Sequence, residues 1–256
     1  MSPVHPEAVR HFVAARAQRP DWPAVPAHLR PATVDDGYAL QAAVHAALAA
    51  AGIARVGYKV GSTSPSGQRS FGLDEPAYAG LFADGRHASL RAALTQPMRA
   101  PSVECEIALV LGRDLSGAAV SREEAAAAVA TCHLGCEVID NRYGAPLEHG
   151  VPSLLADDFF NAGFVLGEAE DGWTPDALRG RAAEVVVDGR RFAGNTSDVL
   201  DAVDALRWLA GKLAARGLGL RAGEIVFTGA VVPPVAIAAP PTDLALRIEG
   251  FRPLTY

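Results

Sequence analysis

The sequence predicts an α+β fold in which a curled, mostly antiparallel or mixed sheet carries helices on its outside. About eight short strand-like runs lie mostly in the middle and C-terminal parts of the chain, with about four helical stretches between them. Because strands and helices do not strictly alternate, a doubly wound parallel sheet is disfavoured. No internal repeat or low-complexity linker divides the 256 residues. We therefore expect one integrated domain, with an N-terminal helical cap over residues 1–55 and a β-rich region over residues 56–256.

The N-terminal part begins with a predicted helix and a connection. Val9, Phe12 and Val13 recur at helical spacing and give residues 6–18 an apolar stripe. Four prolines then fall within residues 20–31. Because proline interrupts helices and favours extended backbone, we expect this stretch to run over the surface.

A second helix is predicted over residues 34–51. Thr33, with Asp36 three residues later, resembles a capping box at its start. Gly52 follows the last apolar position and is typical of a residue that ends a helix.

A short strand is predicted next, over residues 53–62, and it contains Lys59 between two apolar residues. A lysine in that position is often a solubilising residue of an edge strand. It can equally be a catalytic or anion-pairing ammonium inside a site. The polar residues 63–75 that follow predict a mobile loop.

The remaining elements are short strands separated by two further helices. We expect a turn at Asp84-Gly85, strands over 102–112, 134–140 and the tail of 159–167, a hairpin over 183–193, and strands over 224–232 and 244–248. The helices are expected from Ser121 to near His133 and over residues 198–216, and a loop is expected over residues 144–156.

Composition and charge exclude several classes of protein. The formal net charge of −6 and the lack of a Lys/Arg block argue against a nucleic-acid surface. No apolar run approaches the length of a membrane span, and no secretory signal begins the chain. An odd number of cysteines, three, suits a reducing compartment, so we expect a cytoplasmic protein.

Two carboxylates, Glu104 and Glu106, stand one residue apart in the strand predicted over residues 102–112. Alternation places them on the same face, with Cα atoms roughly 6.6 Å apart. A third carboxylate, Glu137, lies in the strand after the next helix. Three carboxylates on two adjacent strands can bind a divalent cation, although Glu-x-Glu is also common on the solvated face of an edge strand.

Five stretches, taken together and in order, resemble one family. They are 57–61 (Gly-Tyr-Lys-Val-Gly), 72–76 (Gly-Leu-Asp-Glu-Pro), 103–108 (Val-Glu-Cys-Glu-Ile-Ala), 137–140 (Glu-Val-Ile-Asp) and 161–163 (Asn-Ala-Gly). They resemble the 2-keto-4-pentenoate hydratase family, within the fumarylacetoacetate hydrolase superfamily. The resemblance implies a mixed β-roll with helices outside and a homo-oligomer, often built from pentamers. It also implies a lyase acting on 2-hydroxydienoates or 2-oxo-enoates in the breakdown of aromatic compounds.

The resemblance further implies a Mg²⁺ or Mn²⁺ ion held by Glu104, Glu106 and Glu137. Such an ion, gripping the carboxylate and 2-oxo oxygen of a small oxo acid, stabilises an enolate. Lys59 would pair with the substrate carboxylate or carry a proton.

Further candidates have less support from the sequence. Asp84 and Asp157 are candidate catalytic residues that could touch substrate or a water, and turn or cap roles fit them as well. Ser62, Thr228 and Gly229 are candidate substrate-binding residues, and Gly229 permits either close approach of a ligand or a bulge.

The chain departs from the family pattern at three places. Ala230 stands where serine is usual, residues 201–203 replace Gly-His-Pro, and residues 157–160 are bulkier than usual. These differences concern the pocket more than the fold. The leading hypothesis is a hydratase; the alternatives are a 4-oxalocrotonate-type decarboxylase, an acylpyruvate C–C hydrolase, and a non-catalytic protein that binds a small oxo acid.

Overall fold

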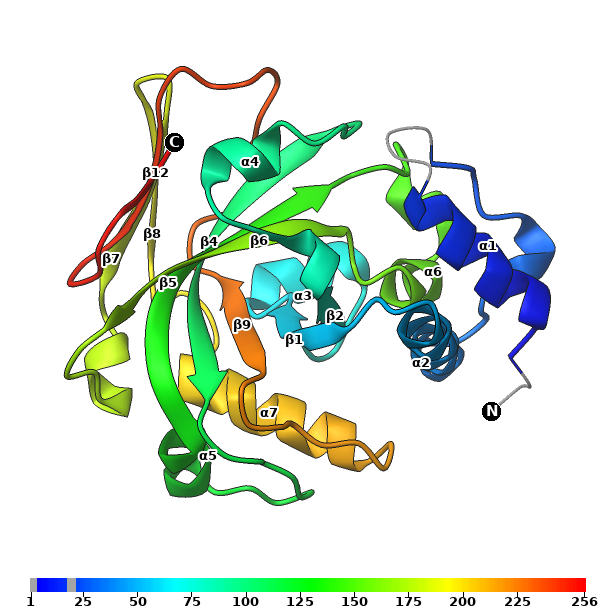
Figure 1. Cartoon of the computed structure of the whole chain (residues 1–256), viewed down its shortest axis with the longest axis horizontal. Coiled ribbons are helices and arrows are strands. Elements are labelled where there is room, and N and C mark those ends of the chain that lie inside the picture. The colour runs from blue at the N-terminus through cyan, green and yellow to red at the C-terminus, as the bar shows by residue number, and fades with distance from the viewer. Residues whose placement is uncertain (1–3, 18–21) are drawn as a thin grey trace.

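A curved mixed sheet runs through the middle of the molecule (Figure 1). The computed structural model describes residues 4–17 and 22–256. The strands of this sheet are β1 (Arg55–Gly61), β2 (Ala77–Phe82), β3 (Arg86–His87), β4 (Pro101–Leu111), β5 (Val129–Asp140), β6 (Asn161–Glu170), β9 (Ile225–Ala230) and β10 (Val235–Ala236). Their order is β2-β1-β9-β4-β5-β6-β3, and β10 pairs with β4. The pairs β1–β9 and β3–β6 are parallel and the other pairs are antiparallel, which confirms the mixed sheet predicted from the sequence.

A smaller antiparallel sheet lies beside the large one, at the left of Figure 1. Its strands, in the order β12-β11-β7-β8, are β12 (Leu254–Thr255), β11 (Leu244–Ile248), β7 (Ala182–Val187) and β8 (Arg190–Asn195). The predicted hairpin is confirmed, because β7 and β8 pair around Asp188 and Gly189, which both have positive φ angles.

Helices cover the outside of the sheets (Figure 1). They are α1 (Pro6–Ala17), α2 (Val34–Ala50), α3 (Pro65–Phe71), α4 (Leu90–Leu94), α5 (Arg122–Ala128), α6 (Val151–Ala156) and α7 (Ala202–Ala214). Short 3₁₀ turns occupy Ala27–Leu29, Ala83–Gly85, Pro146–His149 and Pro175–Leu178. The helices α1 and α6 both pack against α2, while α7 packs against α5 and β9.

The helices predicted near the N-terminus and over residues 198–216 are confirmed. Within α2, the Asp36 amide donates to Thr33 Oγ1 at 3.1 Å, so Thr33 caps the helix as expected. The later helix begins at Ala202, further along than expected, because Asp201 caps it. Residue 18, the last of the first expected helix, and Pro20, in the connection that follows it, lie outside the described residues.

Three sequence predictions of local structure were wrong. Residues 65–71 of the expected mobile loop form α3, because Ser64 caps it and Pro65 suits its first turn. Residues of the loop expected over 144–156 form a 3₁₀ turn and α6. The helix expected to reach His133 ends at Ala128, because the β-branched residues Val129 and Thr131 that follow pair with β4 and begin β5.

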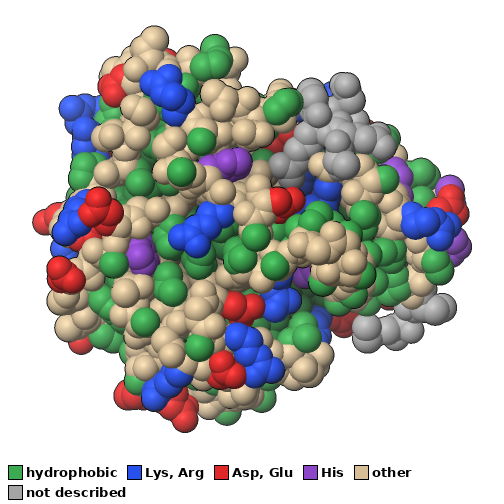
Figure 2. Space-filling view, viewed as in Figure 1, with side chains coloured by type: hydrophobic (Ala, Val, Ile, Leu, Met, Phe, Trp, Pro, Cys, Tyr) green, Lys and Arg blue, Asp and Glu red, His purple; other side chains and the backbone are tan. Residues whose placement is uncertain are grey.

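The surface carries charges of both signs. On the face drawn in Figure 2, basic and acidic side chains of the described residues lie interspersed. Among the helices of the described residues, none combines the length and the apolar character that crossing a bilayer would need.

Candidate metal centre and active-site cavity

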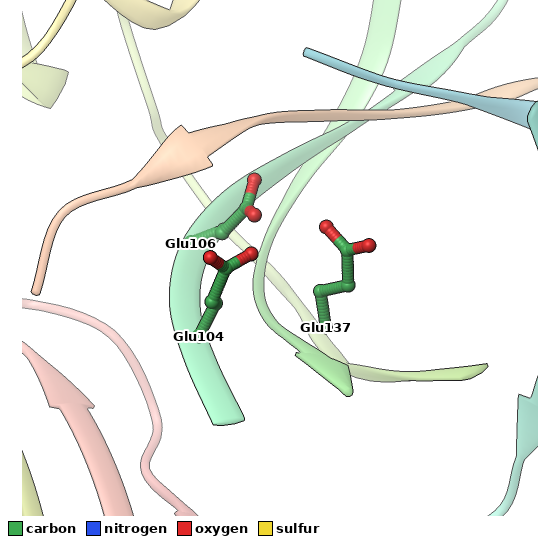
Figure 3. A group of neighbouring side chains, drawn as sticks. All are labelled: Glu104, Glu106 and Glu137. Carbon is green, nitrogen blue, oxygen red and sulfur yellow. The ribbon is translucent and has the colours of Figure 1, made fainter. Parts of the chain in front are cut away.

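The antiparallel pairing of β4 with β5 brings three carboxylates together (Figure 3). Glu104 lies directly opposite Glu137, and Glu106 lies two residues further along the same face. One carboxylate oxygen from each residue lies within 4.8 Å of the others. The alternation predicted from the sequence is therefore confirmed. We call Glu104, Glu106 and Glu137 the acidic trio.

Neighbouring groups fix the orientation of the trio but leave part of it without a partner. Gly229 N donates to Glu106 Oε2 at 2.7 Å, and Asn161 Nδ2 donates to Glu137 Oε1 at 2.9 Å. Glu137 Oε2 is buried and has no hydrogen-bond partner among the described residues. A buried carboxylate oxygen without a partner is costly, so the trio is prepared for a ligand that supplies positive charge.

The trio also carries more negative charge than its surroundings balance. Burial, together with the nearby Glu137 carboxylate, raises the pKa of Glu104 to about 8. Burial and the Glu137 and Glu104 carboxylates raise the pKa of Glu106 well above its usual value. Hard divalent cations prefer oxygen ligands of this kind. The donor set and the unpartnered oxygen fit such a cation.

Lys59 is the basic partner of the trio. Its Nζ lies 2.9 Å from Glu137 Oε1 and donates to Phe159 O at 2.8 Å. Burial alone would lower the pKa of the ammonium, but Glu137, Glu104 and Glu106 outweigh it and raise that pKa. Because β1 lies between β2 and β9, Lys59 is not a solubilising residue of an edge strand.

A cavity of ≈ 540 Å³ lies beside two members of the trio, Glu104 and Glu106, while Glu137 lies behind its lining. Lys59, Glu104 and Glu106 line it, as does Ser62, one of the candidate substrate-binding residues. Ser62 has a φ of 53°, in the left-handed region, and its buried Oγ has no partner among the described residues. An unpaired hydroxyl next to charged groups is suited to bind an oxygen of a ligand.

Thr228 and Gly229 shape the site from behind its wall. The Thr228 hydroxyl donates to Ile107 O at 2.9 Å, and the side chain is buried. Gly229 has a φ of +115°, and a Cβ there would lie 2.1 Å from Thr63 Oγ1. Glycine is therefore required where the backbone turns its amide toward Glu106. Ala230, next in the chain, lines the cavity.

Asp84 and Asp157 lie outside the lining of this cavity. Asp84 is exposed in a 3₁₀ turn and borders a separate pocket of ≈ 100 Å³ that Asn161 also lines. Asp157 is buried, and its Oδ2 lies 2.7 Å from Arg142 Nη2 and 2.8 Å from Arg142 Nε. The expected turn role of Asp84 is confirmed. A catalytic role for Asp84 or Asp157 stays a prediction, since neither residue lines the cavity.

A turn of three left-handed residues, 158–160, was not anticipated from the sequence. Asp158, Phe159 and Phe160 have φ angles of 54°, 47° and 69°. Non-glycine residues rarely adopt this conformation, and tertiary contacts must hold it. Phe159 and Phe160 line the cavity, so this turn forms one of its walls.

Ionic contacts from two helices anchor the start of that turn. Asp158 Oδ2 lies 2.7 Å from Arg16 Nη1, and its Oδ1 lies 2.7 Å from His45 Nε2. Gly80 N donates to Oδ1 at 2.8 Å. Burial alone would raise the pKa of Asp158, but these partners outweigh it and lower that pKa to about 2. The aspartate is therefore ionised and holds the turn in place.

Comparison with known proteins places these features in context. The family model described as fumarylacetoacetate (FAA) hydrolase C-terminal matches residues 81–254. A 2-keto-4-pentenoate hydratase of Paraburkholderia phymatum is 34% identical over 215 residues, which cover 83% of this chain and 81% of the relative. A second, of Burkholderia vietnamiensis, is 34% identical over 197 residues, covering 76% of this chain and 74% of the relative.

Solved structures share the fold. The 4-oxalocrotonate decarboxylase from Pseudomonas putida G7, complexed with magnesium and adipate, superimposes with a TM-score of 0.85 at 24% identity, over 97% of this chain and 95% of that one. The fumarylpyruvate hydrolase from Pseudomonas aeruginosa, in complex with Mn²⁺ and pyruvate, gives a TM-score of 0.61 at 18% identity, over 79% and 88%.

Proposed function

This chain belongs to the fumarylacetoacetate hydrolase family, and we propose that it is a metal-dependent hydratase, a lyase of aromatic-compound catabolism. Its substrate would be a 2-hydroxy-2,4-dienoate, the enol of a 2-oxo-4-enoate, and its product a 4-hydroxy-2-oxo acid. The observation that carries the proposal is the acidic trio, which faces Lys59 beside a cavity that Glu104, Glu106 and Lys59 line. Relatives named for hydration of such dienoates support it.

Glu104, Glu106 and Glu137 would hold the cation, for which we propose Mg²⁺ or Mn²⁺. When bound, the ion supplies Lewis-acid chemistry that favours the enolate of an α-oxo acid. The backbone amide of Gly229 and the amide of Asn161 keep two of the carboxylates oriented for it.

The residues of the chain then bind the substrate and move its protons. Lys59, held by Phe159 O, presents a positive charge where a substrate carboxylate would lie beside the trio. The dienol becomes a conjugated enone when its hydroxyl proton leaves and C5 gains a proton; water then adds across C3=C4, with its hydroxyl on C4 and a proton on C3. Lys59, an ammonium whose pKa is raised, would give the proton that C5 gains, a role that contributes typically about 10²–10⁴-fold. The Ser62 hydroxyl is available to an oxygen of the substrate.

The direct test is to replace Glu106 with alanine. We expect the variant to lose turnover of 2-hydroxypenta-2,4-dienoate by about 10³-fold or more, because charge stabilisation at the reacting oxygen is lost. Ultraviolet absorbance of the dienoate measures turnover, and Mn²⁺ titration followed by electron paramagnetic resonance measures ion binding separately. Glu148→Gln, an exposed carboxylate change in a 3₁₀ turn, is the matched control.

Each other outcome identifies an alternative. Unchanged turnover in Glu106→Ala would refute the proposal. Release of CO₂ from a 2-oxo-enedioate, without hydration, would indicate a decarboxylase. Cleavage of an acylpyruvate would indicate a C–C hydrolase. Binding of oxalate or pyruvate without turnover of any dienoate would indicate a non-catalytic protein.

We also propose a cytoplasmic homo-oligomer, a pentamer or decamer, that acts on a small 2-oxo acid. Sedimentation velocity of the full chain with the cation present measures the assembly. A monomer across micromolar concentrations would contradict this part of the proposal.

A further inference from the structure

Three phenylalanine rings meet at the cavity beside the trio. Phe71 comes from the end of α3, and Phe159 and Phe160 come from the left-handed turn. Ring centroids lie 4.9 Å apart for Phe71–Phe159, 5.4 Å for Phe159–Phe160 and 6.1 Å for Phe71–Phe160. These distances suit mutual aromatic contact. We call the three residues the phenylalanine wall.

The wall lies next to the charged groups. Lys59 Nζ is 5.4 Å from the centre of the Phe159 ring. Further apolar side chains continue the lining: Val60, Ile139, Val199, Val231, Pro233 and Pro234. The lining also carries hydroxyl groups, from Ser62, Thr63, Ser64, Ser66 and Ser70. A substrate whose oxo-acid end faces the trio and Lys59 would therefore meet apolar side chains and neutral hydroxyls, but no second cation among the described lining residues.

The charge of the lining disfavours a second acidic group on the substrate. Among the described residues that line the cavity, Lys59 alone carries a positive charge, and it already faces the trio. Asp198 lines the cavity as an exposed carboxylate and would repel an anionic tail. A carboxylate moved from water into such surroundings without a cationic partner is penalised.

The wall cannot readily move aside. Asp158 is held by Arg16, His45 and the Gly80 amide, and Phe159 O accepts the hydrogen bond from Lys59. The same turn therefore positions the catalytic ammonium and two rings of the wall. A preorganised apolar surface improves selectivity because binding does not have to order it.

We propose that the enzyme selects 2-hydroxydienoates with an apolar, aryl or branched-alkyl tail and rejects those that end in a second carboxylate. This inference rests on the proposed function, since it assigns the tail of the substrate whose head the trio and Lys59 bind.

The experiment compares kcat/KM of the Mn²⁺-loaded enzyme on three substrates: 2-hydroxy-6-phenylhexa-2,4-dienoate, 2-hydroxypenta-2,4-dienoate and 2-hydroxyhexa-2,4-dienedioate. We expect the phenyl-tailed compound to exceed the dioate by at least about 100-fold. Equal or faster turnover of the dioate would overturn the inference.

Variants test which side chains set the ratio of kcat/KM for the phenyl-tailed substrate to kcat/KM for the dioate. Phe71→Ala should reduce the phenyl-to-dioate ratio by about 10-fold, because it removes one ring from the end of a helix. Asp198→Lys should reduce the same ratio by speeding the dioate, and this exposed change avoids the core. Phe251→Ala, outside the cavity lining, should leave the ratio as it is. An unchanged ratio in both cavity variants would contradict the assignment of the wall.

Binding separates this inference from the proposed reaction. Calorimetry with Mn²⁺ present compares 4-phenyl-2-oxobutanoate with 2-oxoglutarate, neither of which can be hydrated. If no dienoate reacts but the phenyl compound binds more tightly, the proposed function fails, while the preference of the cavity for an apolar tail on a 2-oxo acid is supported. If no dienoate reacts and the two acids bind alike, the inference fails as well.

Discussion

The Arg142–Asp157 pair is buried and the acidic trio is largely buried, but only the pair matches each negative charge with a positive one. Arg142 donates to both Asp157 and the carbonyls of Phe160 and Asn161, and it lies 4.6 Å from the Trp22 ring. The trio instead gathers three carboxylates around the single ammonium of Lys59, whereas the pair matches one carboxylate with one guanidinium. Breaking a balanced buried pair destabilises the fold, whereas an unbalanced cluster is typical of a binding site. The contrast predicts different responses to substitution.

The largest effect on stability should follow from breaking the balanced pair. Asp157→Ala leaves the Arg142 guanidinium buried without its carboxylate, so we expect the free energy of unfolding to fall by about 3–5 kcal/mol. Urea denaturation measures it, with Asp171→Ala at an exposed position as the control. Replacing both residues, as Arg142→Met with Asp157→Leu, should recover most of the loss. A fall below about 1 kcal/mol in Asp157→Ala would show that the pair is not what holds this segment.

The unbalanced trio should make the metal-free protein less stable as the pH rises, whereas an ordinary salt-bridged carboxylate makes a protein more stable as the pH rises. The pKa of Glu104 is raised to about 8 and that of Glu106 is raised too, so above pH 4.5 the folded state binds more protons than the unfolded state. Stability should therefore fall as the pH rises from about 4.5 to about 8, on the order of 1–3 kcal/mol.

Thermal denaturation of chelator-treated protein across this pH range measures the effect. Glu104→Gln should flatten the dependence, because it removes one of the titrating carboxylates. Saturating Mn²⁺ should also flatten it, since bound carboxylates remain ionised. A metal-free protein that becomes more stable between these pH values would contradict the charge imbalance.

The smallest effect belongs to an ion pair on the surface. Lys212 pairs with Glu75, and their side chains are 33% and 50% exposed. Because water screens such a pair, Glu75→Gln should change the free energy of unfolding by no more than about 0.5 kcal/mol. Urea denaturation beside Asp157→Ala provides the comparison. A loss above about 1.5 kcal/mol would remove the distinction between exposed and buried pairs.

The regular parts of the site could be predicted from the sequence. Strand alternation alone places Glu104 and Glu106 on one face, and antiparallel pairing of consecutive strands brings Glu137 opposite. The hairpin around Asp188-Gly189 and the cap at Thr33 follow from local rules in the same way. Such features depend on residues close in sequence, or on one register.

The irregular parts depend on contacts between residues distant in the sequence. The left-handed turn at residues 158–160 exists because Arg16, His45 and Gly80 hold Asp158, and none of them is near it in the chain. The pairing of Asp157 with Arg142, 15 residues earlier, could not be read from the sequence for a similar reason, and a catalytic role for Asp157 stays a prediction. Short helices such as α3 were missed because seven residues leave little periodicity to detect.

The contacts of Asp158 with α1 and α2 have a consequence for chimeras made between this chain and its relatives. Arg16 in α1 and His45 in α2 contact Asp158, and its neighbour Phe159 accepts the hydrogen bond from the Lys59 ammonium through its carbonyl. A chimera that exchanged residues 1–55 for those of a relative would keep every metal-ligand candidate, yet it would lose these contacts wherever the relative lacks an arginine and a histidine at the matching positions. Grafts between family members therefore need to carry residues 16, 45 and 158 as one transferable unit.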